Sequence, residues 1–534
     1  MYVANMEKAN IVLTGFMGTG KTTVGRLLAQ QLGYDFVDTD ALIEQRAGKA
    51  IPEIFEQLGE AAFRKMEADL ARELADRQAV VISTGGRMML DPDNAAALTR
   101  TGRVFCLVAT PEEILDRVTK DAEHERPLLA VSDPMERIVE LMQDRKADYG
   151  RFPQMQTSRK SPDMVSKNLI GIFKANPDLR IPITALTTSY EFIVGAGILP
   201  FVSHLGGIMG PVAIITDSHI GPRYAKSCGA VDLVIEVPPG QQHKTLTTVQ
   251  EISEQLVDRG FDRSGTILGL GGSVISGLAG FVAATYMRGV DLVHCPTSLL
   301  AMIDTAIGGK VGINLPQGKN LIGAFKQPKA VIADVATLQT LSPSEFADGM
   351  AEVVKHGLIG GGELFEKIKN GSWKWDAWPQ QPPLDALQEL VAQAIQLKIQ
   401  IVQEDPYEEG RRALLNLGHT FAHAIEHASR HSVSHGEAVA MGLVAAVNLS
   451  ARLGHCDGDL QATVETVLAD ADLPRRIPAS LPPDKILAAM QHDKKKRGSR
   501  LRLILLKGIG DAFVAEGVPP AAISETLAAV TARV

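Results

Sequence analysis

The sequence predicts an α/β protein with two parallel-sheet folds in succession, the second of which leads into a mostly helical part. Three observations support this class. Strand-like and helix-like stretches alternate from residue 10 to 150, the same alternation restarts after residue 183, and long helical patterns dominate after about residue 338. At roughly 100–200 residues per domain, a chain of 534 residues is long enough for several domains.

The first fold rests on three continuous apolar runs, at 10–14 (NIVLT), 79–83 (AVVIS) and 103–108 (RVFCLV). Each run is typical of a strand that is covered on both faces. Helices are predicted from residue 22 to about 33 and from 161 to about 174. Two prolines in 176–182 disfavour helix in the residues before them, so we place the first domain at 1–176.

The second fold continues with further strand patterns, and these lie at 212–217, 232–237, 266–272, 291–296 and 330–335. After them, helical stretches such as 384–403 and 436–453 dominate, with few strand patterns before 500–506. The sequence therefore predicts a Rossmann-like α/β domain at 177–338 and a mostly helical domain at 339–534.

Composition excludes several classes of protein. Apolar residues make up 45% and charged residues 22%, which excludes a wholly disordered or fibrous chain. The net charge is −8, without a basic half or tail, so we expect neither a nucleic-acid nor an anionic-membrane partner. The four cysteines form no CxxC pattern, and no apolar run approaches the ~20 residues that span a bilayer. We expect a soluble cytoplasmic enzyme.

A phosphate-binding turn follows the first strand. Residues 15–22 (GFMGTGKT) match GxxxxGK[ST], after a strand and before a helix, and Thr23 follows. The glycines Gly15, Gly18 and Gly20 would let backbone N–H groups approach phosphates. Lys21 would reach the terminal phosphates, and Thr22 would hold Mg²⁺. The motif predicts a P-loop domain that binds nucleotide phosphates and Mg²⁺, and by itself it does not distinguish a kinase from an ATPase or GTPase.

An acidic pair closes the next strand pattern. Asp38 could order Mg²⁺, and Asp40 could accept a proton from a substrate hydroxyl, although Asp-Thr-Asp alone is also a common helix cap. Arg64, Arg126 and Arg145 follow. Together they would suit an anionic substrate, whereas a single arginine on a helix is more often solvated.

Residues 8–175 resemble shikimate kinase through GFMGTGKTT, FVDTD, FRKME, TGG and RPLL, in order and at family spacing. The resemblance implies that Lys21 and Thr22 serve ATP–Mg²⁺, with Asp38 near the metal. It implies that Asp40 takes the proton of the shikimate 3-hydroxyl and that Arg126 lies on the transferring phosphate. The residues that would hold shikimate are Arg64, Gly86 and Arg145. One departure is Arg87, which replaces the third glycine of the usual GGG and could crowd the substrate loop.

The second half contains a Gly-rich turn and unusual lysines. The turn at 270–277 (LGGSVISG) follows a strand pattern, but such turns are often empty. Lys310 and Lys319 lie in Gly-rich stretches that we interpret as loops, where lysine indicates a nearby anion.

Five histidines recur every four residues at 419, 423, 427, 431 and 435. Any i,i+4 pair on a helix could chelate a metal, and spacing alone favours His419 and His423 as ligands. Ser432-Val433-Ser434 is poor helix, so the series is expected to break before His435. Glu352 is a plausible distant ligand.

Residues 190–510 resemble 3-dehydroquinate synthase through GLGGSVIS, AATYMRG, PTSLLAMIDTAIGGKVGIN, GKNLIGAFKQP, AEVVKHGLI, RRALLNLGHTFAHAIEH and SHGEAVAMG. The resemblance assigns Zn²⁺ (or Co²⁺) to Glu352, His419 and His435, and it places His423 beside the substrate phosphate. The positions matching substrate contacts are Asp304, Lys310, Lys319, Asn320, Lys355, Lys398, Arg412, Asn416 and Lys494. The positions expected to bind NAD⁺ are Asp217, Lys244, Gly271, Gly272, Ser273, Thr297 and Ser298. Arg288 matches an arginine that is borrowed from a partner subunit, which implies a homodimer through the C-terminal half.

The resemblance implies the conversion of 3-deoxy-arabino-heptulosonate 7-phosphate to 3-dehydroquinate and phosphate, with NAD⁺ and Zn²⁺. Two departures lie on the NAD⁺ side, because Gln241 and Gly277 stand where the family has carboxylates. We therefore predict weaker NAD⁺ binding with the chemistry retained.

Three alternatives remain open at this stage. The C-terminal half could be a related sugar-phosphate cyclase. Residues 183–534 could instead be a relative of the glycerol and alcohol dehydrogenases, although an uncharged alcohol needs no cluster of lysines and arginines. One half could instead be a catalytically inactive binding module, which only Arg87, Gln241 and Gly277 favour.

Overall fold

The computed structural model describes residues 9–120, 129, 133–149, 152, 154–175, 179–185, 188–208, 210–229, 231–371, 373, 383–408, 410–430, 432–497 and 501–532. The chain divides into two compact units, residues 1–176 and 177–534. Among the described helices, none combines the length and the apolarity that crossing a bilayer requires.

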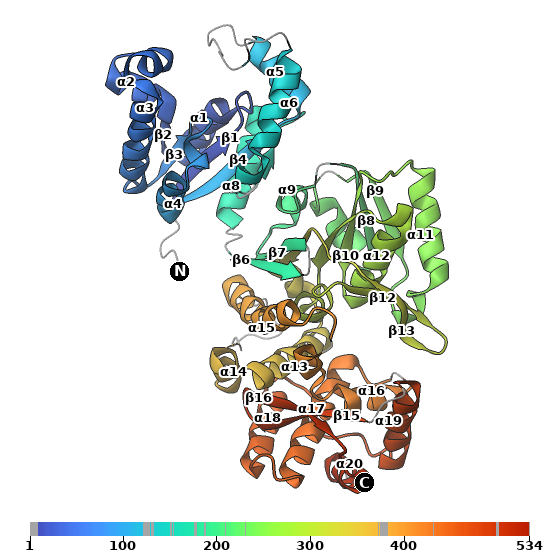
Figure 1. Ribbon diagram of the computed structural model, residues 1–534. Helices are drawn as coiled ribbons and strands as arrows, with labels where there is room; N and C mark the ends of the chain where they lie inside the picture. Colours follow the sequence, from blue (N-terminus) through green and yellow to red (C-terminus); the bar gives the residue numbers. More distant parts are fainter. Residues whose placement is uncertain are drawn as a thin grey trace. The chain divides into compact units, whose positions relative to one another are not determined.

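The first unit is a five-stranded parallel sheet in the order β2-β3-β1-β4-β5, with helices around it (Figure 1). Its strands are β1 (Asn10–Gly15), β2 (Asp35–Asp38), β3 (Val80–Ser83), β4 (Gly102–Val108) and β5 (Gln154–Gln156). Its helices are α1 (Lys21–Leu32), α2 (Thr39–Ala47), α3 (Ile51–Ala75), α4 (Pro92–Thr101), α5 (Pro111–Lys120), α6 (Pro134–Asp144), α7 (Lys146–Tyr149) and α8 (Pro162–Ala175). The apolar runs at 10–14, 79–83 and 103–108 lie in β1, β3 and β4, so this part of the prediction is confirmed.

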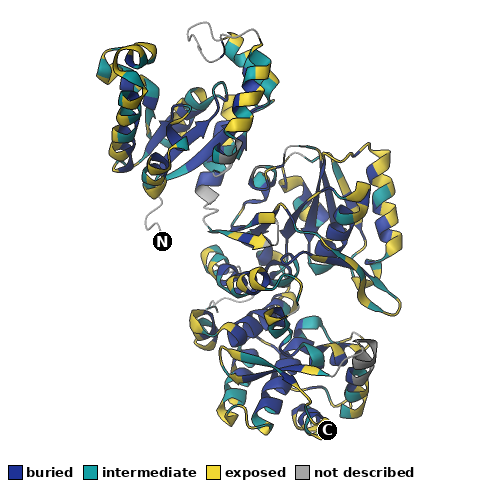
Figure 2. Ribbon diagram, viewed as in Figure 1, coloured by how far each residue is buried: buried dark blue, intermediate teal, exposed yellow. Residues whose placement is uncertain are grey.

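The α/β part of the second unit is a seven-stranded sheet in the order β6-β7-β14-β11-β10-β8-β9. Its strands are β6 (Leu179–Ala185), β7 (Thr188–Gly195), β8 (Val212–Asp217), β9 (Leu233–Val237), β10 (Thr266–Gly271), β11 (Asp291–Pro296) and β14 (Ala330–Asp334). Its helices are α9 (Val202–Leu205), α10 (Gly221–Tyr224), α11 (Leu246–Asp258) and α12 (Ser273–Thr285). Figure 2 shows the strands of this sheet as mostly buried and α11 with a broad exposed face.

The strand order reverses between β8 and β10. After β8 the chain adds β9 on one side of it and then crosses to add β10 on the other side. In open α/β sheets, ligands bind outside the carboxyl ends of the strands at such a point. Asp217 ends β8 and Gly271 ends β10, so both predicted cofactor residues lie at this crevice.

The helical part contains α13 (Pro343–Gly360), α14 (Gly362–Lys369), α15 (Leu384–Glu404), α16 (His419–Ala428), α17 (His435–Arg452), α18 (Gly458–Asp470), α19 (Pro483–Arg497) and α20 (Pro520–Val530), with a hairpin of β15 (Arg502–Gly508) and β16 (Asp511–Glu516). Helices α13, α15, α16 and α17 contribute to one large apolar core. The prediction of a Rossmann-like part followed by a mostly helical part is confirmed.

Six strands were not predicted, namely β5, β16, the pair β6–β7, and the pair of β12 (Lys310–Leu315) and β13 (Gly318–Phe325). Lys310 and Lys319 do not lie in loops but on the antiparallel hairpin of β12 and β13. Their Gly-rich sequence hides the strands, because cross-strand pairing rather than local propensity forms them. The strands β6 and β7 were also missed. Pro182 is tolerated in β6 because that strand forms the edge of the sheet.

Candidate functional site

The P-loop of the first unit has the predicted form. Gly20 precedes α1 with a φ of 94°, a left-handed conformation that glycine adopts without strain. Lys21 folds back over the turn, and its Nζ donates hydrogen bonds of 2.9 and 3.0 Å to the carbonyl oxygens of Gly15 and Phe16. Gly18 lies in the same turn, and Thr23 is exposed on the first turn of α1.

Thr22 and Asp38 lie together, as a shared magnesium site requires. The Thr22 hydroxyl donates a 2.7 Å hydrogen bond to Asp38 Oδ2. Asp38 also caps α2, since its Oδ1 accepts from the Ala41 amide at 3.4 Å. Capping and metal binding are therefore compatible at this carboxylate, and the fit supports Mg²⁺ at the end of β2.

Asp40 points to the turn that follows β3, where it leaves no room for a side chain on Gly85. Burial, then the charge of Asp38, raise the pKa of Asp40 to about 6, although Lys21 opposes the shift. A carboxyl with this pKa can take up a proton near neutral pH. The guanidinium of Arg145 stacks over the Phe16 ring at 5.5 Å, and its Nη1 is 3.9 Å from the position of a Cβ on Gly86.

Arg64 is held by two carboxylates of its own helix. It donates to Glu67 Oε2 at 2.6 Å and to Glu60 Oε1 at 3.0 Å. Glu60 also pairs with Arg87 at 3.6 Å, so the exposed Arg87 side chain lies toward α3. Glu67 is buried and was missed from the sequence, although it lies one helical turn after Arg64. Arg126 lies outside the described residues.

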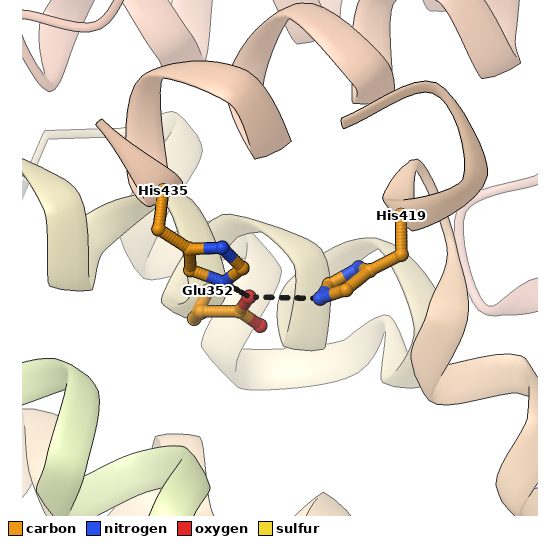
Figure 3. A group of neighbouring side chains, drawn as sticks. All are labelled: Glu352, His419 and His435. Carbon is orange, nitrogen blue, oxygen red and sulfur yellow. Dashed lines mark ion pairs between the residues drawn. The ribbon is translucent and has the colours of Figure 1, made fainter. Parts of the chain in front are cut away.

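In the second unit, one buried carboxylate meets two imidazoles (Figure 3). Glu352 on α13 is fully buried, and its Oε1 lies 3.3 Å from His419 Nε2 and 3.4 Å from His435 Nε2. One ligand atom from each of the three residues lies within 4.8 Å of the others. A Glu-His-His set is a familiar catalytic zinc site, so these donors fit the ion.

Local structure explains why these side chains meet. Helix α13 begins with a capping box in which Ser342 and Glu345 bond each other's backbone amides. An equivalent box of Ser434 and Glu437 starts α17 at His435. Helix α16 ends at Ala428, so the histidine series breaks before His435, as the sequence predicted.

His423, which spacing alone favours as the second ligand, does not belong to the group that Glu352, His419 and His435 form. Its ring lies edge-to-face against His419, with centroids 5.5 Å apart, while His435 faces Glu352 instead. Spacing along one helix identifies only neighbours on that helix, whereas this cluster draws on three helices.

Buried cations surround the cluster. Lys355 pairs with Glu352 Oε2, and Lys398 donates to Asp304 Oδ1 at 2.5 Å. Burial raises the pKa of Glu352, but the charges of Lys355 and His419 outweigh it and hold this pKa well below its usual value. Arg412 is buried, and it donates to the carbonyl of Pro406 at 2.6 Å.

The hairpin lysines have acidic partners that the sequence did not reveal. Lys310 pairs with Glu408, whose Oε1 accepts from Asn416 Nδ2 at 2.8 Å. Lys319 lies 3.2 Å from Glu426 Oε1, and the same oxygen is 3.5 Å from His435 Nδ1. Glu426 lies seven residues after His419 on one helical face, which was the available indication. For Glu408, the sequence holds no comparable pattern.

The nucleotide side is formed by neighbouring strand ends. Gly271 and Gly272 lead into Ser273 at the start of α12, and the Thr297 amide donates to the Gly271 carbonyl at 3.1 Å. A β-carbon on Gly272 would lie 3.6 Å from Ser298 Oγ, which brings the two segments together. Asp217 caps its own turn, accepting from the amides of His219 and Ile220.

Lys244 links two segments of the site, whereas Arg288 and Lys494 have no part in the contacts above. Lys244 donates to Asn320 Oδ1 at 2.8 Å, which joins the cofactor segment to the hairpin. Arg288 is exposed beyond α12, and none of the contacts above involves it. The side chain of Lys494, on α19, lies outside the described part.

Both units therefore have the architecture of small-molecule enzymes, one with a P-loop and an acidic pair, the other with a metal-ligand cluster beside a Rossmann-like sheet. Residues 17–172 match the shikimate kinase family, residues 234–348 match 3-dehydroquinate synthase N-terminal, and residues 349–496 match 3-dehydroquinate synthase C-terminal. The chain belongs to the 3-dehydroquinate synthase family, and it carries a shikimate kinase domain ahead of the synthase.

Curated relatives agree with this assignment. The chain is 44% identical over 351 residues to 3-dehydroquinate synthase of Acidithiobacillus ferrooxidans, which covers 64% of this chain and 95% of the relative. It is 42% identical over 339 residues to 3-dehydroquinate synthase of Dehalococcoides mccartyi, and the match covers 62% of this chain and 93% of the relative.

A solved structure of 2-epi-5-epi-valiolone synthase from Streptomyces hygroscopicus, with NAD⁺ and Zn²⁺ bound, is 26% identical with a TM-score of 0.59. It covers 65% of this chain and 98% of that one. The synthase matches decide against the glycerol or alcohol dehydrogenase alternative.

Proposed function

We propose that the chain catalyses two reactions, one in each unit. The first unit phosphorylates shikimate to shikimate 3-phosphate with ATP. The second converts 3-deoxy-arabino-heptulosonate 7-phosphate to 3-dehydroquinate and phosphate. The observation that carries the second assignment is the convergence of Glu352, His419 and His435 in a unit that matches the synthase family.

In the kinase unit, Lys21, Thr22 and Asp38 would hold Mg²⁺–ATP, which supplies the phosphoryl group. Asp40 would take the proton of the attacking hydroxyl, and its pKa of about 6 supports this role. Arg64, Arg145 and the Gly86 backbone would hold the shikimate carboxylate and ring. Arg126 would neutralise charge on the transferring phosphate.

In the synthase unit, Zn²⁺ (or Co²⁺) held by Glu352, His419 and His435 would supply Lewis-acid chemistry, and NAD⁺ would accept and return a hydride. Lys355, Lys398 and Arg412 are buried cations that suit a substrate bearing a carboxylate. Asp304 would orient Lys398, with which it pairs.

The phosphate side of the same substrate would meet a second group of residues. His423 and Lys319 would stabilise the leaving phosphate, with Lys310, Asn320, Asn416 and Lys494 completing the enclosure. The Gly271-Gly272-Ser273 turn, Thr297, Ser298, Asp217 and Lys244 would hold NAD⁺ at the carboxyl ends of β8, β10 and β11.

Reciprocal substitutions test both assignments and the inactive-half alternative. Alanine at His435 should abolish release of inorganic phosphate from the heptulosonate phosphate and leave shikimate phosphorylation intact. Lys21→Ala should do the reverse. If either wild-type activity is missing, that half is inactive. If either variant silences both activities while folded, independent sites are the wrong picture.

We infer that the protein is a homodimer through its C-terminal half. Met287 and Arg288 are exposed with left-handed φ values of 46° and 66°, and Leu321, Phe325 and Tyr407 are exposed large apolar residues of the same unit. One chain carrying Arg288→Ala and a second chain carrying His435→Ala should regain synthase activity when the two are mixed. If Arg288 acts across subunits, one site of the mixed dimer then has an intact His435 from its own chain and an intact Arg288 from the other. Inactive mixtures, or a monomer by light scattering, would contradict this.

The four cysteines are all unpaired, which supports the cytoplasmic location that we infer. The substrates of the protein are small molecules. Its net charge is weakly acidic and evenly distributed along the chain, which supports the prediction that the protein binds neither nucleic acid nor membrane.

A further inference from the structure

The two imidazoles of the cluster are both anchored from behind, but by different groups. His419 Nδ1 lies 3.2 Å from the carbonyl oxygen of Leu417, and His435 Nδ1 lies 3.5 Å from Glu426 Oε1. A neutral imidazole that carries its proton on Nδ1 leaves the lone pair on Nε2. Both Nε2 atoms face Glu352, so with its proton on Nδ1 each ring would offer the Nε2 lone pair to a metal held beside that carboxylate.

The two anchors differ in kind. The anchor of His419 is a backbone carbonyl, whereas the anchor of His435 is the buried side chain of Glu426, which also has a second partner. Its Oε1 lies 3.2 Å from Lys319 Nζ, on the hairpin of the α/β part, while Glu426 itself lies on α16 of the helical part. One oxygen thus contacts both a residue of the metal cluster and a residue expected beside the substrate phosphate.

We propose that Glu426 is a positioning residue that fixes the tautomer and orientation of His435 for the metal and ties this ligand to the hairpin through Lys319. The inference rests on the proposed metal site. A carboxylate behind a ligating histidine raises the basicity of the ligand and stops its ring from rotating, and losing such a partner typically weakens metal binding ~10–100-fold.

Substitutions that keep or remove the shape, the charge and the contact of Glu426 separate the positioning role from simple packing. Glu426→Gln keeps the shape but removes the charge, and its amide can turn its NH₂ group toward Nδ1, which would favour the wrong tautomer. Glu426→Ala removes the contact altogether. Lys319→Met removes the competing ammonium and leaves the carboxylate to His435. Glu525→Gln is the matched control, since Glu525 pairs with Arg452 at the surface of the same unit.

The experiment measures the Zn²⁺ dissociation constant of the full chain by competition with a chromophoric chelator, with circular dichroism as the check on folding. Glu426→Gln and Glu426→Ala should bind Zn²⁺ about 10–100-fold more weakly. Lys319→Met should bind it at least as tightly as wild type, and Glu525→Gln should be unchanged. With Co²⁺, the visible absorption of Glu426→Gln should differ from that of wild type.

A folded Glu426→Gln protein whose Zn²⁺ affinity is within threefold of wild type would overturn the proposal. His435→Ala, measured alongside, separates the two possible failures. If His435→Ala loses Zn²⁺ and Glu426→Gln does not, only the positioning role is wrong. If neither variant loses Zn²⁺, the metal site itself is wrong. Should Glu426→Ala fail to fold, the isosteric glutamine variant decides the matter.

Discussion

The ammonium group of Lys244 occupies the space that a side chain on Gly277 would need. Lys244 is 6% exposed, and it donates a hydrogen bond to the neutral amide of Asn320. Burial, and then the charge of Lys319, lower the pKa of Lys244 to about 8. Gly277, where the family resemblance leads us to expect a carboxylate, therefore lies directly against the Lys244 ammonium.

This relationship predicts how NAD⁺ affinity responds to substitution. Gly277→Asp should tighten NAD⁺ binding by about one to two decades, because a charge-assisted hydrogen bond contributes ~1.5–3 kcal/mol and the flexible end of Lys244 can move aside to pair with the new acid. Gly277→Ala displaces the lysine without adding a carboxylate, so it should not tighten binding. Isothermal titration of NAD⁺ into the full chain measures both, and equal affinities for Asp and Ala would contradict the argument.

His419 and His423 should differ sharply in their effect on bound metal. His419→Ala removes a donor that faces Glu352, so the purified chain should lose most of its zinc. His423→Ala should keep its zinc, because its ring packs against His419 rather than facing the carboxylate. Elemental analysis after dialysis distinguishes the two variants. Equal loss of zinc from both variants would indicate that His419 and His423 are both ligands, as spacing alone favours.

The pH dependence of the kinase follows from Asp40. Its pKa is raised to about 6, so the carboxylate that accepts the proton is present above this pH and is lost below it. The kcat/KM for shikimate should therefore fall about tenfold for each pH unit below 6. Asp40→Asn should be slow at every pH and lack this slope. A wild-type profile that stays flat from pH 7 to 5 would exclude Asp40 as the base.

Lys355 should stabilise the metal-free synthase unit. Lys355 and Glu352 form a fully buried pair. Removing one partner of such a pair costs ~3–5 kcal/mol, and because His419 and His435 also lie beside Glu352, we expect a loss at the lower end of that range. Lys355→Met should lower the free energy of unfolding by about this amount without zinc and by less with zinc, because the ion then compensates Glu352. The three tryptophans are Trp373, Trp375 and Trp378, so their fluorescence during urea unfolding reports on this unit alone.

The double variant Lys355→Met with Glu352→Gln provides the control for that measurement. It removes both charges and should cost less in the metal-free protein than Lys355→Met alone. If the double variant were the less stable of the two, packing rather than charge would explain the loss.

Local sequence was sufficient to predict those structural features whose residues are contiguous in the chain. The P-loop could be predicted in full because a strand, a Gly-rich turn and a helix follow one another within a few residues, and backbone geometry alone places Lys21 and Thr22. Buried parallel strands such as β1 and β10 were equally readable, since both faces are covered and their apolar runs are continuous. The β12–β13 hairpin was not, because glycines and exposed residues interrupt its pattern.

The metal cluster shows the limit of what the sequence by itself determined. The sequence supplied the donor types and a break in the histidine series, and the family resemblance selected Glu352, His419 and His435. Residues alone favoured His423, since periodicity orders side chains only along one helix. Tertiary structure decided that the first residues of α16 and α17 meet α13, and it added Glu426 and Glu408. Partners from separate elements are fixed by packing between helices and strands, which local sequence does not encode.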